Sequence, residues 1–368
     1  MRTINFTTLS PECRNIELVK DVGQIPYVLG NEHQDIDTSI VASCIKKDGP
    51  NLENVQGLKL IHRPLFLKNY ELTGLVYLLF HARKIDWLSL HHAGRRSYYW
   101  TKIYKFLNPK GKVYLKLDMD FRSCDMYDND EWERSIFFKN TNIIDLITVE
   151  TEAIKNRIQK YSAKDIKILG NGYCKSSVEP NISKRRNRSF ITVGRLGTRQ
   201  KATEILLEAF AESAKEHDWN LILVGSIEEE FKSYINEFFR KHPELRERII
   251  FKGEIEDRDE IYTEYCSARV FLLPSRWEGF PIVSGEALLC GLRVIVSDLV
   301  PPMKEMTNNE MFGQIVPADD IGALCRAIIR ETQRKFSCNE VFAIKEYAET
   351  QFSWSKICNE LYDLLMES

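Results

Sequence analysis

The chain has 368 residues, of which 43% are hydrophobic and 28% charged, and its formal net charge at pH 7 is −2. This length accommodates two domains of ordinary size, and the composition is that of a globular protein. The near-neutral charge excludes a polycation that binds nucleic acid through bulk charge. Because the sequence contains no run of about 18 apolar residues, we expect no membrane-spanning helix.

The nine cysteines are scattered along the chain, without a C-x-x-C pair or a Cys/His spacing typical of metal sites. We therefore expect reduced thiols in a cytoplasmic protein and no metal ion. The first residues lack the apolar core of a signal peptide and are predicted to form a strand.

Apolar runs alternate with helix-like periodicity through the first half of the chain. We predict strands at residues 3–9, 36–43, 58–61, 86–91, 113–117 and 143–149, and helices at 17–31 and about 70–84. Strands that alternate with helices predict a parallel sheet with helical crossovers.

The composition changes after Gly172. Residues 175–188 are polar and basic and form the strongest linker candidate, and the strand pattern restarts at 190–193. The predicted fold class is α/β, with two Rossmann-like domains at residues 1–170 and 171–352.

The segment 270–298 predicts a strand–loop–helix–strand unit. Val270 to Leu273 is a buried strand, Pro281 suits the first position of a helix, Gly291 suits its end, and 292–296 is the next strand. The loop follows the carboxyl end of a parallel strand, where ligands of open α/β sheets bind.

Two acidic residues, Glu278 and Glu286, belong to this unit. Glu278 precedes the helix, beside N–H groups that form an anion site at the helix N-terminus. Glu286 lies inside the helix, where its carboxylate can accept hydrogen bonds from two adjacent hydroxyls, as on a ribose. The alternative is an acid that favours the helix dipole and an exposed helical glutamate.

Glu278, Gly279, Phe280 and Pro281, followed by Glu286, resemble the E-x7-E signature of the retaining glycosyltransferases of family 4, which have the GT-B fold. Further segments resemble the family's diphosphate-binding segment (189–196 with Lys201), its second strand (221–225) and its nucleobase-side strand (250–255). The similarity is continuous from about 168 to 330 and returns at 352–356, whereas the N-terminal half matches loosely.

This resemblance implies two Rossmann-like domains that face each other across a cleft, and a C-terminal helix, about 353–368, that crosses back to the first domain. It implies a nucleoside diphosphate sugar as donor, with UDP preferred to GDP, and neither a metal nor a cofactor. The donor contacts implied are Gly23, Arg195, Lys201, Ile255, Glu278, Gly279, Phe280, Pro281, Ile282 and Glu286.

Arg195 and Lys201 flank the turn between a strand and the helix predicted at 202–212. A guanidinium and an ammonium can neutralise the charge that grows on a leaving diphosphate. The alternative is a solvated polar loop. Ala202 stands where the family usually has glycine, and the loop after Gly225 lacks the family's second glycine. No dinucleotide-binding or P-loop motif occurs.

In the first half, Gly23 resembles a glycine in the family's donor-facing loop, although a glycine early in an amphipathic helix is an equal alternative. His91 ends a predicted strand where family members carry a histidine near the sugar; a structural hydrogen bond is the alternative. We interpret Glu278, His91, Arg195 and Lys201 as the catalytic set. His92, Asp118 and Asp120 are predicted to orient the acceptor, unless the two aspartates only begin an acidic loop.

Residues 92–116 hold seven basic residues, six aromatic ones and no acid. A basic amphipathic helix with Tyr99 or Trp100 inserted could attach the protein to an anionic membrane. The alternative is a solvated helix with its aromatic residues in the core. No RNA-binding motif accompanies the segment, so we expect no nucleic-acid partner.

The sequence therefore predicts a retaining glycosyltransferase that transfers a sugar to a hydroxyl of a sugar or lipid-linked glycan, in polysaccharide or glycolipid assembly. It would be cytoplasmic and peripheral on the inner face of the membrane. The rival hypotheses are another GT-B enzyme, such as a sugar-nucleotide epimerase or a phosphorylase, and a non-catalytic nucleotide-sugar sensor.

Overall fold

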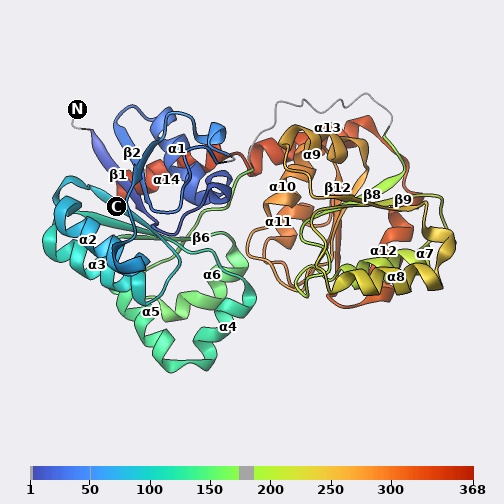
Figure 1. The fold of residues 1–368 in the computed structure, drawn as a ribbon, viewed down its shortest axis with the longest axis horizontal. Coiled ribbons are helices and arrows are strands. Elements are labelled where there is room, and N and C mark those ends of the chain that lie inside the picture. The colour runs from blue at the N-terminus through green and yellow to red at the C-terminus, as the bar shows by residue number, and fades with distance from the viewer. Residues whose placement is uncertain (1–2, 50, 174–185) are drawn as a thin grey trace. The chain divides into compact units, whose positions relative to one another are not determined.

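The computed structural model describes residues 3–49, 51–173 and 186–368. The chain divides into two compact units, Met1–Cys174 with Phe352–Ser368, and Lys175–Gln351 (Figure 1). We call them the N-terminal and C-terminal units. Most of the predicted linker, 175–188, lies outside the described residues.

The N-terminal unit contains a seven-stranded parallel sheet in the order β3-β2-β1-β4-β5-β6-β7. Its strands are β1 (Ile4–Leu9), β2 (Ile36–Ala42), β3 (Lys59–His62), β4 (Trp87–His91), β5 (Lys112–Lys116), β6 (Leu146–Val149) and β7 (Lys167–Ile168). Its helices are α1 (Asp21–Glu32), α2 (Tyr70–His81), α3 (Arg95–Leu107), α4 (Phe121–Asn129), α5 (Glu131–Ile143), α6 (Glu152–Ile158) and α14 (Trp354–Glu367).

Helices cover both faces of this sheet. One face packs on α1 and α14 through a cluster that includes Phe6, Ile25 and Leu361, and the other packs on α2, α3 and α5 around Leu88 and Tyr104. The C-terminal helix α14 thus belongs to the N-terminal unit, where the Tyr362 hydroxyl donates to Asp35 over 2.8 Å.

The C-terminal unit contains a six-stranded parallel sheet in the order β10-β9-β8-β11-β12-β13. Its strands are β8 (Ser189–Val193), β9 (Asn220–Val224), β10 (Ile249–Gly253), β11 (Val270–Leu273), β12 (Arg293–Ser297) and β13 (Gly313–Val316). Its helices are α7 (Thr203–Ser213), α8 (Phe231–Lys241), α9 (Arg258–Ser267), α10 (Ile282–Leu289), α11 (Met303–Thr307), α12 (Ile321–Gln333) and α13 (Cys338–Gln351).

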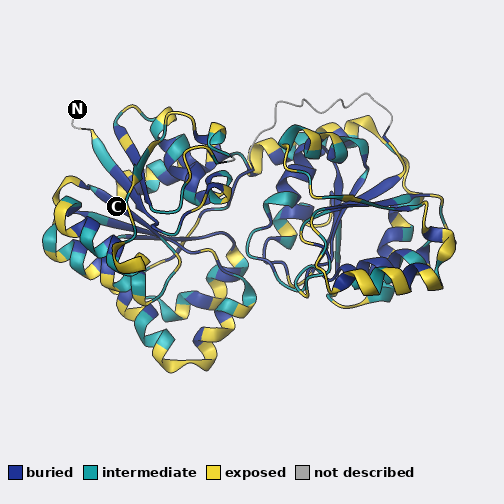
Figure 2. Cartoon of the chain, in the orientation of Figure 1, coloured by how far each residue is buried: buried dark blue, intermediate teal, exposed yellow. Residues whose placement is uncertain are grey.

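Buried strands form the centre of each unit (Figure 2). Phe190, Phe210 and Leu272 are among the completely buried side chains of the second core. Burying each such side chain stabilises the fold by about 1.5–3 kcal/mol, which explains why the apolar runs located these strands correctly. The two parallel α/β sheets confirm the predicted fold class.

Several predicted boundaries are wrong, for local reasons. The helix predicted at 17–31 is divided into a short 3-10 helix, Asn15–Val19, and α1, because Lys20 between them is extended. The strand predicted at 143–149 begins only at Leu146, because α5 extends to Ile143. No described helix is both long and apolar enough to cross a membrane.

Candidate functional site

The loops at the carboxyl edge of the C-terminal sheet approach each other closely where two glycines meet. The φ angles of Gly194 and Gly225 are +155° and +136°, and a Cβ atom on Gly225 would lie 1.9 Å from the carbonyl oxygen of Gly194. A side chain cannot fit at position 225. The loop after β9 is therefore held against the loop after β8, which carries Arg195 and Lys201.

Lys201 and Glu278 form an ion pair at this edge. The distance from Lys201 Nζ to Glu278 Oε1 is 2.6 Å, and the Glu278 residue is only 7% exposed. The Gln200 side-chain amide donates to the other carboxylate oxygen over 3.2 Å and to the carbonyl oxygen of Trp277 over 3.1 Å. Charge-assisted bonds such as this pair are the stronger class of hydrogen bond, so both side chains have fixed positions.

Arg276 joins the same two loops. Its backbone N–H donates to Gln200 O over 2.8 Å, and its guanidinium donates to Arg199 O over 2.9 Å and pairs with Glu204 and Asp319 at 2.6 Å each. Sequence reasoning missed both Gln200 and Arg276. The available signal was the presence of polar residues directly beside Lys201 and Glu278.

Arg195 lies at the start of the loop after β8 and is exposed. It makes no ion pair with another described residue, so its guanidinium is available to an anionic ligand. At the end of the same loop, Ala202 has a φ of +48°. This left-handed conformation favours glycine, and an alanine adopts it at a cost of about 1–2 kcal/mol.

Glu286 is buried inside α10 and oriented by α9. Its Oε1 atom accepts from Arg258 Nη2 over 2.6 Å, and its Oε2 atom lies 3.4 Å from the Tyr265 hydroxyl. A carboxylate has about four acceptor sites, so Glu286 can accept further hydrogen bonds from a pair of ligand hydroxyls. Arg258 and Tyr265 were not predicted as supporting residues.

The remaining predicted donor contacts lie on the same edge. Gly279 and Phe280 belong to the half-buried loop after β11, Pro281 caps α10, and Ile282 is its first residue. The prediction that Pro281 itself starts the helix is wrong by one residue. Ile255 lies beyond the end of β10, which stops at Gly253, and not within the strand as expected.

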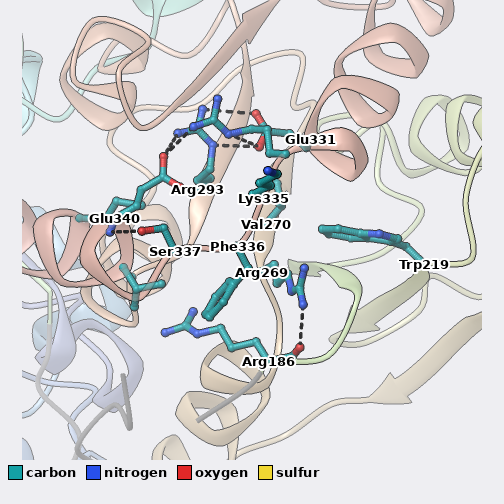
Figure 3. Close-up of a pocket in the computed structure, with 14 residues that line it drawn as sticks. Arg186, Trp219, Arg269, Val270, Arg293, Glu331, Lys335, Phe336, Ser337 and Glu340 are labelled. Carbon is teal, nitrogen blue, oxygen red and sulfur yellow. Dashed lines mark hydrogen bonds and ion pairs between the residues drawn. The ribbon is translucent and has the colours of Figure 1, made fainter. Parts of the chain in front are cut away.

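A different hollow lies at the amino ends of β11 and β12. It measures only about 30 Å³, and Arg293 along its wall pairs with Glu331 and Glu340 at 2.8 Å each (Figure 3). Ligand pockets usually measure 300–1,000 Å³, and these charges already satisfy one another. We assign this hollow a structural role.

In the N-terminal unit, His91 and Lys116 are the last residues of neighbouring strands and lie side by side in register. The His91 side chain is 5% exposed, and its Nε2 atom lies 3.8 Å from Asp21 at the start of α1. Burial lowers the pKa of His91 to about 4, partly offset by Asp21. The imidazole is therefore neutral near pH 7 and can donate or accept a hydrogen bond.

We predict that His91 remains neutral down to about pH 5. The pKa of His91 in the folded protein lies below the ordinary value of about 6.5. Its contribution to the free energy of unfolding is therefore complete above pH 6.5 and is lost as the pH falls towards 4. Nitrogen-15 NMR of labelled histidine checks this, with exposed His92 as the matched control. A titration of His91 near pH 6.5 would contradict the burial argument.

Lys116 is fully buried, which corrects its assignment to a surface segment. Its ammonium donates to Glu150 over 3.1 Å and to the carbonyl oxygen of Leu169 over 3.2 Å. Burial raises the pKa of Glu150 to about 8, although Lys116 lowers it. The buried pair of Lys116 and Glu150 was not predicted. The alternation of polar and apolar residues along β5 does not show whether the lysine at its end points into the core or into solvent.

The predicted acceptor residues lie beyond the ends of β4 and β5. His92 is exposed and has a φ of +61°, and Asp118 is exposed. Asp120 caps α4 and accepts from the Ser123 N–H and hydroxyl at 2.6 Å each. This cap already explains an acid at position 120, whereas Asp118 and His92 face solvent.

Gly23 does not lie in a loop, so that part of its prediction is wrong. It lies within α1, where a Cβ atom would be 2.3 Å from the carbonyl oxygen of Leu18, and its N–H donates to Lys20 O over 3.1 Å. The glycine permits close helix packing, and its amide is already bonded within the protein.

Trp100 is buried, so its predicted insertion into a membrane is also wrong. Its indole N–H donates to Glu71 O over 3.0 Å, between α3 and α2. Arg96 pairs with Glu12, and Arg95 stacks 4.3 Å from the Trp132 ring centroid. Besides His92 and Pro109, the exposed residues of the segment 92–116 are Arg95, Tyr99, Lys102, Phe106 and Lys110.

The carboxyl edge of the sheet in the C-terminal unit thus carries two cations, Arg195 and Lys201, and two buried carboxylates, Glu278 and Glu286. A family model described as "Glycosyl transferases group 1" matches residues 187–333. An uncharacterized glycosyltransferase of Haemophilus influenzae is 28% identical over 188 residues, half of each chain. The Escherichia coli UDP-Gal:alpha-D-GlcNAc-diphosphoundecaprenol alpha-1,3-galactosyltransferase is 29% identical over 41% of this chain and 38% of its own length.

Among solved structures, Anabaena Alr3699/HepE in complex with UDP superposes over the full length of both chains, with a TM-score of 0.71 and 16% identity. That similarity shows the GT-B fold. The alignments span half or less of the length of the curated relatives. Residues 187–333, most of the C-terminal unit, therefore match the glycosyl transferases group 1 family, within a chain that has the GT-B fold.

Proposed function

We propose that this protein transfers a sugar from a nucleoside diphosphate donor to a hydroxyl acceptor, with retention of the anomeric configuration. The observation that carries the proposal is the buried Glu278, bonded to Lys201 and Gln200 beside the exposed Arg195. This cluster combines a carboxylate for sugar hydroxyls with two cations for a leaving diphosphate.

Each residue then has a distinct role. Arg195 and Lys201 bind the diphosphate, with the N-terminal N–H groups of α10, and stabilise the charge that develops as it leaves. Glu278 and the backbone of 279–282 bind the sugar, and Glu286, oriented by Arg258, binds the ribose. The acceptor hydroxyl attacks from the face that the diphosphate leaves, and the diphosphate assists its deprotonation. For His91, in the N-terminal unit, the neutral imidazole is the form that can donate a hydrogen bond to a sugar hydroxyl.

We favour UDP as the nucleotide. This choice is supported by the UDP complex of the Anabaena protein and by the name of the E. coli relative, a UDP-galactose transferase. That relative's name also supports a lipid-linked glycan as the class of acceptor, and a role in polysaccharide or glycolipid assembly.

The test is to incubate the protein with a panel of UDP- and GDP-sugars and glycan acceptors, and to follow donor and product by NMR. We expect UDP release, an acceptor-dependent product with the donor's anomeric configuration, and undiminished turnover in excess EDTA. An epimeric nucleotide sugar formed without acceptor would instead support the epimerase, and phosphate-dependent sugar 1-phosphate formation would support the phosphorylase. Donor binding without any turnover would support the sensor.

We predict that Glu278→Gln and Glu286→Gln differ in their effects. Glu286→Gln should weaken UDP and the UDP-sugar about equally, because both carry the ribose. Glu278→Gln should weaken only the UDP-sugar and also lower turnover. Calorimetric titration of both variants with both ligands checks this, and equal losses throughout would refute the division of roles.

We further propose that the exposed side of α3, formed by Arg95, Tyr99, Lys102 and Phe106, together with Lys110 in the turn after it, attaches the protein to anionic membranes. Each basic residue near such a surface contributes about 1 kcal/mol. Co-sedimentation with anionic vesicles at low salt, release at high salt and no binding to neutral vesicles are expected. Wild-type binding by an Arg95→Glu/Lys102→Glu variant would contradict this placement.

A further inference from the structure

Two adjoining hollows lie along α2 at the edge of the N-terminal sheet, and neither belongs to the site described above. The first measures about 530 Å³ and lies over β1, β2 and β3, from Asp37 and Lys59 near their amino ends to Arg63 just after β3. The second measures about 210 Å³ and lies along the flank of α2 that faces residues 63–66. Both are lined by Arg63, Tyr77 and His81, so the hollows meet at these side chains.

The three shared side chains are fixed in place. The His81 ring stacks on Tyr77 with centroids 4.4 Å apart, and its Nδ1 atom donates to Tyr77 O over 2.9 Å. Its Nε2 atom consequently accepts from Arg63 Nη2, which lies 3.1 Å away. The Arg63 guanidinium lies 5.5 Å from the Tyr77 ring centroid. The junction is therefore a preformed, polar wall.

The larger hollow is polar and positively charged. Thr7 and Ser39, which are 5% and 7% exposed, place hydroxyl groups on a sheet face where apolar packing would be usual. Lys59, Arg63 and Lys84 line the same hollow, and Asp37 is the one acid among its lining residues. The Thr7 and Ser39 hydroxyls bond to each other over 3.2 Å, and Lys59 lies 3.8 Å from Asp37. Three cations against one acid leave an excess of positive charge, which suits an anionic group such as a phosphate monoester.

The smaller hollow is mainly apolar. Pro64, Phe66, Val76 and Phe80 line it, and Phe66 and Phe80 are 48% and 75% exposed. Leu79 and Leu67 beside them are 58% and 75% exposed. A contiguous patch of large exposed apolar side chains is typical of a binding surface.

We propose that these hollows together bind one anionic amphiphile, with its charged head over Thr7, Ser39 and the three cations and its alkyl chain along Phe66 and Phe80. Lys59, Asp37 and Lys84 lie toward the amino ends of the strands, and Arg63 follows β3 at the edge of the sheet. In contrast, His91 ends β4 and Asp118 follows β5, and β1 and β2 separate these two strands from β3. The lining residues are therefore different from the proposed acceptor residues, and the proposal does not depend on the proposed function.

The experiment is a calorimetric titration of the full chain with n-octyl phosphate below its critical micelle concentration. We expect saturable binding of one molecule, and at least tenfold weaker binding of inorganic phosphate, which lacks the chain, and of octyl glucoside, which lacks the charge. Lys59→Ala/Lys84→Ala and Phe80→Ser should each weaken octyl phosphate at least fivefold. The side chains of Lys59, Lys84 and Phe80 are exposed, so we expect both variants to fold.

The matched controls are Lys102→Ala and Phe106→Ser on α3, which carry the same changes outside the hollows, and Arg195→Ala, which removes a phosphate-binding cation from the C-terminal unit. All three should bind octyl phosphate as wild type does. Equal binding of octyl glucoside or of phosphate alone, equal losses in the controls, or no saturable binding would each overturn the proposal.

Discussion

Replacing Arg195 or Lys201 with alanine should reduce transfer activity by roughly 30- to 1,000-fold while the protein remains folded. The reason is that each side chain supplies positive charge where the diphosphate would leave, and such a contact is worth on the order of 2–4 kcal/mol in the transition state. Lys201 is fixed 2.6 Å from Glu278, so its loss also releases the carboxylate assigned to the sugar.

Steady-state kinetics with the donor and acceptor found by the screen measures this effect. Arg199→Ala is the matched control, because Arg199 is an exposed cation of the same loop whose described contact, with Arg276, uses only its backbone oxygen. Wild-type rates in both variants, or an equal loss in the control, would remove these residues from the active site.

Replacing Lys116 with methionine should destabilise the N-terminal unit by up to about 1.4 kcal/mol more at pH 9 than at pH 6. Removing one partner of a buried ion pair leaves the other charge uncompensated, here on Glu150. The pKa of Glu150 is raised to about 8 by burial, so the folded protein holds this proton more tightly than the unfolded chain does. The protonated Glu150 carboxyl therefore contributes fully to the free energy of unfolding below pH 4.5, and this contribution is lost as the pH rises toward 8.

The loss caused by Lys116→Met should therefore be larger at pH 9 than at pH 6. At pH 9 wild-type Glu150 ionises beside Lys116, whereas in the variant it lacks this partner and keeps its proton. Urea unfolding at both pH values measures it, with exposed Lys110→Met as the control. Adding Glu150→Gln should recover most of the stability at pH 9. A loss that is the same at both pH values would show that packing, and not charge, is responsible.

The strands that carry the site could be predicted because they are buried on both faces. Val270 to Leu273 is a continuous apolar run, and a parallel strand covered on both sides needs such a run. Gly291 was predicted to end α10, and it has a φ of +73° there. Local chemistry was sufficient for these elements.

The supporting contacts could not be predicted, because they join residues far apart in the sequence. Gln200 bonds to Glu278 and Arg258 to Glu286 across separations of 78 and 28 residues. Lys116 and Trp100 were misplaced for a related reason, since composition does not show which side of an amphipathic segment faces the core. Gly23 was misread because its neighbour in space is the backbone of Leu18, five residues earlier.

The most direct test of the central claim, that the C-terminal unit binds a nucleoside diphosphate sugar, is a thermal-shift titration with UDP, GDP and their sugar derivatives. A ligand that binds only the folded state stabilises it by about 2.7 kcal/mol at one hundred times its Kd. We predict a saturable rise in Tm with UDP and UDP-sugars that is lost in Lys201→Ala and kept in Arg199→Ala. No rise with any nucleotide or nucleotide sugar, or the same rise in Lys201→Ala, would contradict the account.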